Sequence, residues 1–262
     1  MTLSAPDHEL GPAFTRRNIP MEWGRLSCLH RPGSGSTLIL IPGSFDDSSG
    51  CRDIVERLDA RMQLVVVELR GHGGSWPPPR DASIELFAQD VLTAVSHLGL
   101  ASPLFVGGHS IGGMIAMQLA RVRPEIARGV ISIEGWTSHE VVEDAFAGRI
   151  FDTLTPSLIS RKDETRRRVF ERWSPEQVAE FRTCWKKWDG YEFLAGTGVP
   201  VLELYGDRGR KPPGLDELRI PDRENIELVW VAGASHYLNI ERPGEVARAC
   251  TRFIERIERG GG

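Results

Sequence analysis

A serine inside a glycine-rich pentapeptide is the first candidate for chemistry in this chain of 262 residues. The run Gly108-His109-Ser110-Ile111-Gly112 follows the apolar residues 104–106 and precedes an amphipathic stretch. A sharp turn from strand to helix here would need both flanking glycines, because larger side chains would collide with neighbouring backbone. The turn would raise the Ser110 hydroxyl above the sheet edge, at the positive end of the helix dipole. We therefore predict that Ser110 is a nucleophile, and that His109 points away from the turn and packs.

A serine hydroxyl is a poor nucleophile until a base takes its proton, and histidine is the usual base. His236 is the only histidine after His139, and it lies in a polar loop between the apolar residues 226–231 and a final helical pattern. In a doubly wound sheet, that strand end shares an edge with the serine turn. We predict that His236 is the base. His72, in a Gly-rich loop, is expected to be structural.

Short apolar runs alternate with helical patterns along the chain. The runs occupy residues 36–41, 64–69, 104–106, 130–133, 201–205 and 226–231. Most are continuous in Val, Ile and Leu, as in parallel strands that are covered on both faces. Apolar positions at three- and four-residue spacing predict helices over residues 83–98, after Gly112 and from Pro243 onward. With an antiparallel strand pair in residues 10–31, the pattern predicts an α/β fold, a doubly wound, mostly parallel sheet flanked by helices.

One stretch, residues 136–194, breaks this alternation. It has helical texture, much charge and several aromatic residues, and it is too long for an ordinary connecting loop. We predict that it is a helical cap inserted over the carboxyl edge of the sheet. The core domain would then consist of residues 1–135 and 195–262.

The insertion holds candidate pocket residues and a basic run. Trp136, Trp185 and Trp188 are the aromatic candidates for lining a pocket, although most aromatic residues here are expected to form the core of the insertion. The run Arg166-Arg167-Arg168 is expected to be a solvated helix face, since blocks of like charge usually face water.

The composition excludes several classes of protein. Lys and Arg number 32 and Asp and Glu 36, a net charge of −4 that gives no reason to expect nucleic acid as a partner. Residues 1–9 lack the basic and apolar regions of a secretory signal, and no apolar run approaches the roughly 20 residues that span a membrane. Four scattered cysteines indicate neither a zinc site nor a disulfide framework. We predict a cytoplasmic protein with reduced thiols and without a metal.

These motifs together resemble the α/β-hydrolase superfamily, over nearly the whole length of the chain. The residues that carry the resemblance are Ile41-Pro42-Gly43-Ser44-Phe45, Arg70-Gly71-His72-Gly73, the glycine-rich turn around Ser110, and Gly233-Ala234-Ser235-His236. The resemblance implies a nucleophile elbow at Ser110, a cap between the sixth and seventh strands, and catalytic residues in the order serine, acid, histidine.

An oxyanion hole in such a protein is built from backbone N–H groups. Ile111, directly after the nucleophile, would supply one donor. The other is expected from the loop after Gly43, at Ser44 or Phe45. Many relatives have His-Gly where this chain has Pro42-Gly43, a departure that leaves the donor role of the backbone intact.

The acid has two candidates, and the first is Asp207. Many relatives place the acid three residues after a glycine that follows the seventh strand. Counting from Gly206 leads to Gly209, so this position holds no acid. Asp207 is close but two residues early, and Arg208 or Arg210 could pair with it.

The second candidate, which we favour, is Glu134. Some members of the superfamily, including zearalenone lactonases and the cofactor-free dioxygenases, carry their acid at the end of the sixth strand. Glu134 stands there, directly after the apolar residues 130–133. A carboxylate in that position is costly unless it has a partner, and His236 is the partner available at this edge. Asp207 stays open as the alternative.

We predict a serine hydrolase that cleaves a carboxylic ester or lactone through an acyl-enzyme and needs no cofactor. The tryptophan-rich insertion favours a small apolar or aromatic substrate. Two other functions stay open on this fold. One is a cofactor-free dioxygenase that uses the histidine and the acid as its base. The other is a non-catalytic ligand-binding protein, against which a complete nucleophile, base and acid would argue.

Overall fold

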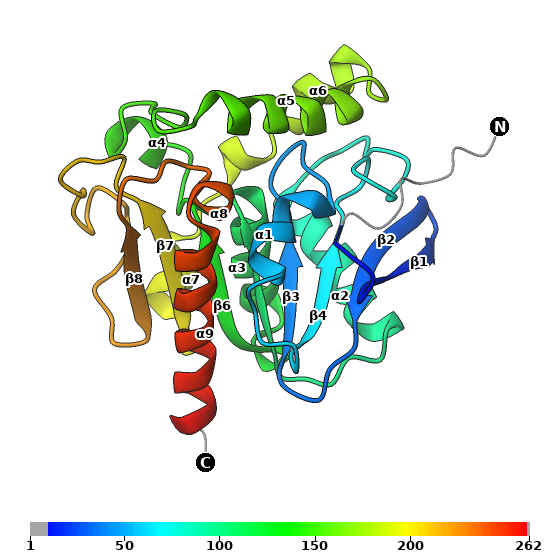
Figure 1. The fold of residues 1–262 in the computed structure, drawn as a ribbon, viewed down its shortest axis with the longest axis horizontal. Coiled ribbons are helices and arrows are strands. Elements are labelled where there is room, and N and C mark those ends of the chain that lie inside the picture. Colours follow the sequence, from blue (N-terminus) through cyan, green and yellow to red (C-terminus); the bar gives the residue numbers. More distant parts are fainter. Residues whose placement is uncertain (1–9, 261–262) are drawn as a thin grey trace.

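Eight strands form one sheet in the computed structural model, which describes residues 10–260. Residues 1–9, for which the sequence predicts no secretory signal, and residues 261–262 lie outside the described part. The strands are β1 (Thr15–Met21), β2 (Gly24–Arg31), β3 (Thr37–Ile41), β4 (Gln63–Val67), β5 (Leu104–His109), β6 (Ala127–Ile133), β7 (Val201–Gly206) and β8 (Ile226–Val231). Their order is β1-β2-β4-β3-β5-β6-β7-β8 (Figure 1). Only the β1–β2 and β2–β4 pairs among them are antiparallel, which confirms the predicted mostly parallel sheet and the antiparallel first pair.

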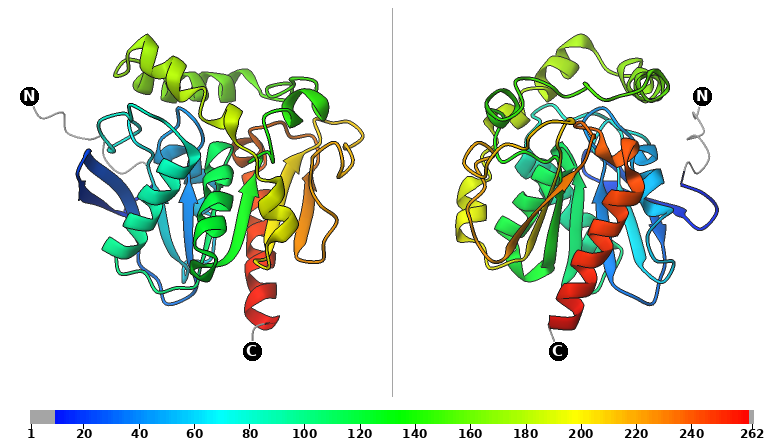
Figure 2. Two further views of the ribbon diagram at one scale, coloured as in Figure 1. Left: turned by 180° about the vertical axis from the view of Figure 1, so that it is seen from behind. Right: turned by 60° about the vertical axis from the view of Figure 1, so that its left-hand side comes forward.

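Helices cover both faces of this sheet. One face carries α2 (Ile84–His97), α3 (Ile111–Val122) and α7 (Tyr191–Gly196), and the other carries α1 (Arg52–Val55), α8 (Leu238–Glu241) and α9 (Pro243–Gly260) (Figures 1 and 2). Every residue of β3, β5 and β7 is buried, because helices cover both faces of these strands. This burial explains why their sequences are mostly apolar. Short 3₁₀ turns are η1 (Ser48–Cys51), η2 (Pro124–Ile126) and η3 (Trp185–Lys187). The apolar residues form two cores, one on each face.

The chain between β6 and β7, residues 134–200, is called the β6–β7 segment below. It contains α4 (Val141–Asp144), α5 (Pro156–Phe170) and α6 (Pro175–Phe181), which lie above the carboxyl ends of the strands (Figure 1). The Thr155 hydroxyl accepts the N–H of Leu158 where α5 begins, and a capping box formed by Ser174 and Gln177 begins α6. The last helix, α7, packs beside α3 against the sheet. The border that we expected at residue 194 therefore falls inside a helix of the core layer.

Charged contacts join α5 to the loops of the core. The ion pairs are Arg161 with Asp53 at 2.6 Å, Lys162 with Asp46 at 2.8 Å and Arg168 with Asp47 at 2.9 Å. The Trp173 indole adds a hydrogen bond of 2.8 Å to the Gly71 carbonyl. Because both members of the Lys162 pair are buried, removing either one would leave an uncompensated buried charge between α5 and the core. The expectation of a wholly solvated basic face is thus wrong for Arg168, which turns toward the core.

All four cysteines of the chain are buried, and none forms a disulfide. Among the helices of the described part, none has both the length and the apolar character that crossing a bilayer requires.

Glu203 is a buried carboxyl group in the middle of the sheet. It lies on β7, in register with Ser132 of β6. The Ser132 hydroxyl is the polar group beside its side chain, and no basic side chain forms an ion pair with Glu203 within residues 10–260. Burial raises the pKa of Glu203 to about 8, and the charge of Glu134 acts in the same direction. The folded protein therefore keeps a proton on Glu203 at neutral pH, which the unfolded chain releases.

We expect Glu203→Gln to stabilise the fold at pH 8 and to have little effect near pH 4.5. A raised pKa in the folded state gives stability that is full below the unfolded value of 4.5 and is lost as the pH rises toward 8. The loss is at most about 1.4 kcal/mol per pH unit, and a glutamine does not suffer it. The free energy of unfolding in urea, measured for both proteins across this pH range, checks the expectation. A difference between them that does not change with pH would contradict it.

Candidate active site

The turn around Ser110 has the geometry that its glycines predict. Ser110 has φ 55° and ψ −122°, between the end of β5 and the start of α3. A Cβ atom on Gly108 would lie 2.4 Å from the Ile41 carbonyl oxygen, and one on Gly112 would lie 2.1 Å from it. Both distances are prohibitive, so only glycine fits at either position. The Ser110 N–H donates to the Ile133 carbonyl at 2.8 Å, which fixes the turn to the end of β6.

Two backbone N–H groups remain free beside this turn. The N–H of Ile111, in the first turn of α3, and that of Ser44 have no partner among the described residues. The N–H of Phe45, our alternative donor, is already committed to His72 Nε2 at 3.1 Å. Ser44 is therefore the better placed of the two.

His72 has the structural role that we expected. Its Nδ1 lies 2.9 Å from the Arg70 carbonyl and so carries the proton, which leaves Nε2 to accept the N–H of Phe45. Burial lowers the pKa of His72 to about 4, so the ring is neutral at physiological pH. A neutral ring in this one tautomer holds the loop after β3 in position.

Glu134 and His236 contact each other at the carboxyl edge of the sheet. Their Oε2 and Nδ1 atoms are 3.2 Å apart, and both side chains are buried. The Glu134 N–H donates to the Leu204 carbonyl at 2.8 Å, which holds the carboxylate at the end of β6. The Trp136 ring packs over His236, with centroids 4.5 Å apart. With Nδ1 donating to Glu134, Nε2 of His236 is left unprotonated and able to accept a proton.

The Glu134 carboxylate is held by partners that sequence reasoning missed. Arg208 binds it with both arms, at 2.5 Å to Oε1 and 2.9 Å to Oε2. The Gly206 N–H donates to Oε1 at 2.8 Å, and the Trp136 indole donates to Oε2 at 3.0 Å. Burial alone would raise the pKa of Glu134, but the Arg208 guanidinium and the contact with His236 together outweigh burial and lower it to about 2. Glu134 is therefore ionised at any physiological pH.

Asp207, the alternative acid, has a different set of partners. Its Oδ1 accepts the N–H groups of Gly209 and Gly233, each at 2.7 Å. No contact between Asp207 and His236 occurs in the described chain. Nor does Arg208 pair with Asp207, as the sequence had allowed, because its guanidinium turns inward to Glu134. Asp207 joins two loops, and Glu134 is the acid in contact with the histidine.

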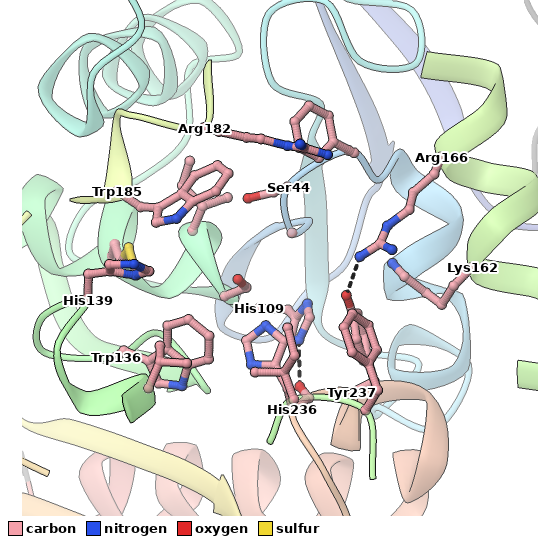
Figure 3. A pocket seen from close by; sticks show the side chains of 18 of the residues that line it. Ser44, His109, Trp136, His139, Lys162, Arg166, Arg182, Trp185, His236 and Tyr237 are labelled. Carbon is pink, nitrogen blue, oxygen red and sulfur yellow. Dashed lines mark hydrogen bonds between the residues drawn. The ribbon is translucent and has the colours of Figure 1, made fainter. Parts of the chain in front are cut away.

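His109 departs from our expectation. Instead of pointing away from the site, its ring lies 4.8 Å from that of His236, and its Nε2 donates to the His236 carbonyl at 2.8 Å (Figure 3). The reason is the close approach of Gly43, where a Cβ atom would lie 2.7 Å from His109 Nδ1. That glycine leaves room for the ring between two loops. Burial lowers the pKa of His109 well below its ordinary range, so it is a neutral brace for the His236 loop.

A cavity of about 450 Å³ opens above these residues. Ser110 lines it. His236, Trp136 and Trp185 line it as well (Figure 3). The prediction that Trp188 lines the pocket is wrong, because the chain becomes extended where η3 ends and the Trp188 ring is buried against Gly190. The remaining walls combine apolar side chains with basic ones from α5, from the C-cap of α6 and from η3. Within residues 10–260, no group of three or more His, Cys, Asp or Glu is arranged to hold a metal ion.

Comparison with known proteins identifies the class. The profile of the alpha/beta hydrolase family matches residues 38–249, and the chain belongs to this family. A Haemophilus influenzae protein named "Putative esterase/lipase" is 30% identical over 250 residues, which cover 84% of this chain and 83% of that protein. An Azorhizobium caulinodans protein named "Putative carbamate hydrolase RutD" is 28% identical over 232 residues, 77% of this chain and 86% of its own. The solved structure described as "Est816 as an N-Acyl homoserine lactone degrading enzyme" shares the fold, with a TM-score of 0.74, 19% identity, and coverage of 90% of this chain and all of that one.

We expect Arg208→Met to destabilise the fold by roughly 3–5 kcal/mol, because Glu134 would stay buried without its counter-charge. The deficit should shrink at low pH, where the pKa of Glu134, no longer lowered by Arg208, allows it to take up a proton. Arg210→Met is the matched control, since Arg210 is exposed and forms no ion pair with a described residue. It should change the free energy of unfolding by no more than about 0.5 kcal/mol. Urea unfolding at neutral and low pH measures both, and similar values for the two variants would contradict a supporting role of Arg208.

Proposed function

We propose that the chain is a serine hydrolase that cleaves carboxylic esters, with lactones as the cyclic form of the same substrate. The observation that carries the proposal is the contact of His236 with the buried, ionised Glu134, in a cavity that Ser110 also lines. The names of the Haemophilus protein and of the Est816 structure supply an independent reason to consider esters and lactones. The β6–β7 segment would act as the cap over the cavity.

In the acylation step, Ser110 Oγ attacks the ester carbonyl while His236 Nε2 takes the hydroxyl proton. The N–H groups of Ile111 and Ser44 bind the oxyanion that forms. When the tetrahedral intermediate collapses, the bond to the alcohol breaks and His236 returns its proton to the leaving oxygen. The acyl group is then an ester of Ser110.

In the second step, a water molecule attacks the acyl-enzyme and His236 again removes a proton. The carboxylic acid leaves, and the proton on His236 returns to Ser110 Oγ. Glu134 keeps its charge throughout, because its role is to fix the imidazole tautomer and to stabilise the imidazolium. These steps consume one water molecule and release one acid and one alcohol, so they need no further reactant.

The charges around the base suit this chemistry near neutral pH. Burial lowers the pKa of His236, whereas the hydrogen bond to Glu134 acts in the opposite direction. Arg208 offsets part of the Glu134 charge and so contributes to the lowering. The imidazole is therefore unprotonated and ready to act as a base at physiological pH.

We expect a fluorophosphonate probe to form one covalent adduct, on Ser110, because only an activated serine displaces fluoride from phosphorus readily. Ser110→Ala should prevent labelling and reduce kcat for a p-nitrophenyl ester on the order of 10⁶-fold, if chemistry limits turnover. Peptide mapping by mass spectrometry locates the adduct. Ser44→Ala is the control, since it keeps its backbone N–H and the label should still reach Ser110. An adduct on Ser44, or undiminished hydrolysis by Ser110→Ala, would overturn the proposal.

We expect Glu134→Gln to lower kcat by roughly 10³- to 10⁴-fold with little change in KM, because the amide neither fixes the tautomer nor opposes the imidazolium charge. Asp207→Asn should have a far smaller effect, since Asp207 contacts backbone N–H groups away from His236. The two variants are compared by steady-state kinetics at matched folded fraction. A large loss in Asp207→Asn beside a mild loss in Glu134→Gln would reverse the assignment. Mild losses in both would mean that neither carboxylate supports the base, and uptake of oxygen without hydrolysis would point to the cofactor-free dioxygenase instead.

A further inference from the structure

The charged side chains that line the cavity are all basic. They are Lys162, Arg166, Arg182 and Lys186, and no Asp or Glu is among the described lining residues. The basic residues come from α5, from the end of α6 and from η3, so they converge on one cavity from separate elements. The whole chain has a net charge of −4, and this local excess of positive charge therefore runs against its overall balance.

Lys162 already has its counter-charge inside the protein. Its Nζ lies 2.8 Å from Asp46 Oδ2, and both side chains are buried. Its charge is therefore compensated before any ligand enters. The positive charge that faces the cavity comes from the other cations.

Arg166 is the best defined of these. One arm of its guanidinium donates to the Tyr237 hydroxyl at 2.7 Å, beside His236 (Figure 3). The Phe151 ring lies 5.5 Å from its guanidinium carbon, and its buried Nε has no hydrogen-bond partner among the described residues. No carboxylate of the described chain lies within ion-pair distance. A half-buried guanidinium with a fixed orientation and unused N–H groups is a site for an anion.

The other basic residues of α5 have acidic partners, so among the described residues the lack of one is specific to Arg166. Arg167, the next residue, points outward and pairs with Glu164 at 2.7 Å and with Glu171 at 2.5 Å. Arg161, five residues before Arg166, pairs with Asp53. The chain therefore supplies acids to arginines elsewhere on this helix and not to Arg166.

Arg182 and Lys186 extend the positive charge toward the solvent. Both are exposed, and neither forms an ion pair in the described chain. The Arg182 guanidinium lies 5.6 Å from the Phe45 ring, next to the loop that carries Ser44 (Figure 3). Exposed cations of this kind attract an anion from a distance, and dissolved salt shortens the range of this attraction.

We infer that the substrate of this site is an anionic ester, with a carboxylate remote from the bond that is cleaved and bound by Arg166. The inference rests on the proposed esterase function and adds the charge of its substrate. It also refines our expectation of a small apolar or aromatic substrate. The apolar walls would bind the carbon skeleton, and the basic side chains would bind its charged end.

The test compares esters of matched shape that differ in charge. Mono-p-nitrophenyl glutarate and p-nitrophenyl valerate exchange a carboxylate for a methyl group on the acyl side. Acetoxybenzoate and tolyl acetate, both para-substituted, make the same exchange on the alcohol side. For each protein, the ratio of kcat/KM for the anionic ester to that for the neutral ester is measured. Intrinsic reactivity cancels, because each ratio is compared between variants.

In Arg166→Gln, the ratio should fall on the order of tenfold to a hundredfold in at least one of the two ester pairs. A decrease of this size is what the loss of one hydrogen bond to a charged group produces. Arg166→Lys keeps the charge but not the planar fork. Its ratio should lie between that of Arg166→Gln and that of the wild type. Arg167→Gln, on the outward side of the same helix, should keep the ratio of the wild type. Added salt should lower kcat/KM for the anionic ester only.

Two kinds of failure are distinguishable. If the wild type hydrolyses the esters through Ser110, but the ratios of Arg166→Gln and Arg167→Gln are equal in both pairs, the anionic substrate is overturned and the esterase stands. If Ser110→Ala hydrolyses all four esters as the wild type does, the proposed function itself fails. Unfolding midpoints of the Arg166 variants establish that a changed ratio comes from a folded protein, and Arg166→Lys repeats the test if Arg166→Gln does not fold.

Discussion

The buried charge of Glu134 is the constraint on which the site depends. A fully buried carboxylate at the end of a strand would destabilise the fold by several kcal/mol if it had no partners. Arg208 and Gly206 reach it from the end of β7, and Trp136 reaches it from the chain that follows β6. These contacts draw the loops together and leave Oε2 facing His236. The position of the base is thus a consequence of how one charge is compensated.

Sequence reasoning succeeded where a local pattern has a single physical explanation. Continuous apolar runs need cover on both faces, which gave the parallel sheet and the order of helices and strands. The glycines around Ser110 have no other use than to let backbone pass where a Cβ would collide with Ile41. The contact of Glu134 with His236 could be predicted for a similar reason, since a charge directly after a buried strand requires a partner. Each of these inferences starts from residues that are neighbours in the chain.

Sequence reasoning failed where a segment distant in the chain decides the direction of a side chain. Arg208 lies beside Asp207 in the sequence but turns to Glu134, a difference that only the packing of β6 against β7 determines. His109 was expected to point away, but Gly43 leaves a space that its ring occupies. The three arginines of the run 166–168 face three different environments. Arg166 faces the cavity, Arg167 faces the solvent, and Arg168 faces the loops of the core. Spacing on a helix separates these faces, but it does not say what lies opposite each.

Burial explains why the charges of the site fall into two groups. Glu134 and Lys162 are buried, so their counter-charges, Arg208 and Asp46, had to be part of the protein itself. Arg182 is exposed, and water and dissolved ions can compensate its charge. Arg166 lies between these cases, because it is held half-buried by Tyr237 while its charge has no acid to meet it. A ligand that fills the cavity would exclude water from this guanidinium, and it would bind well only if it brought a negative charge. The floor of the cavity, with its charges compensated internally, suits a neutral ester carbonyl, and its basic wall favours a ligand whose far end is an anion.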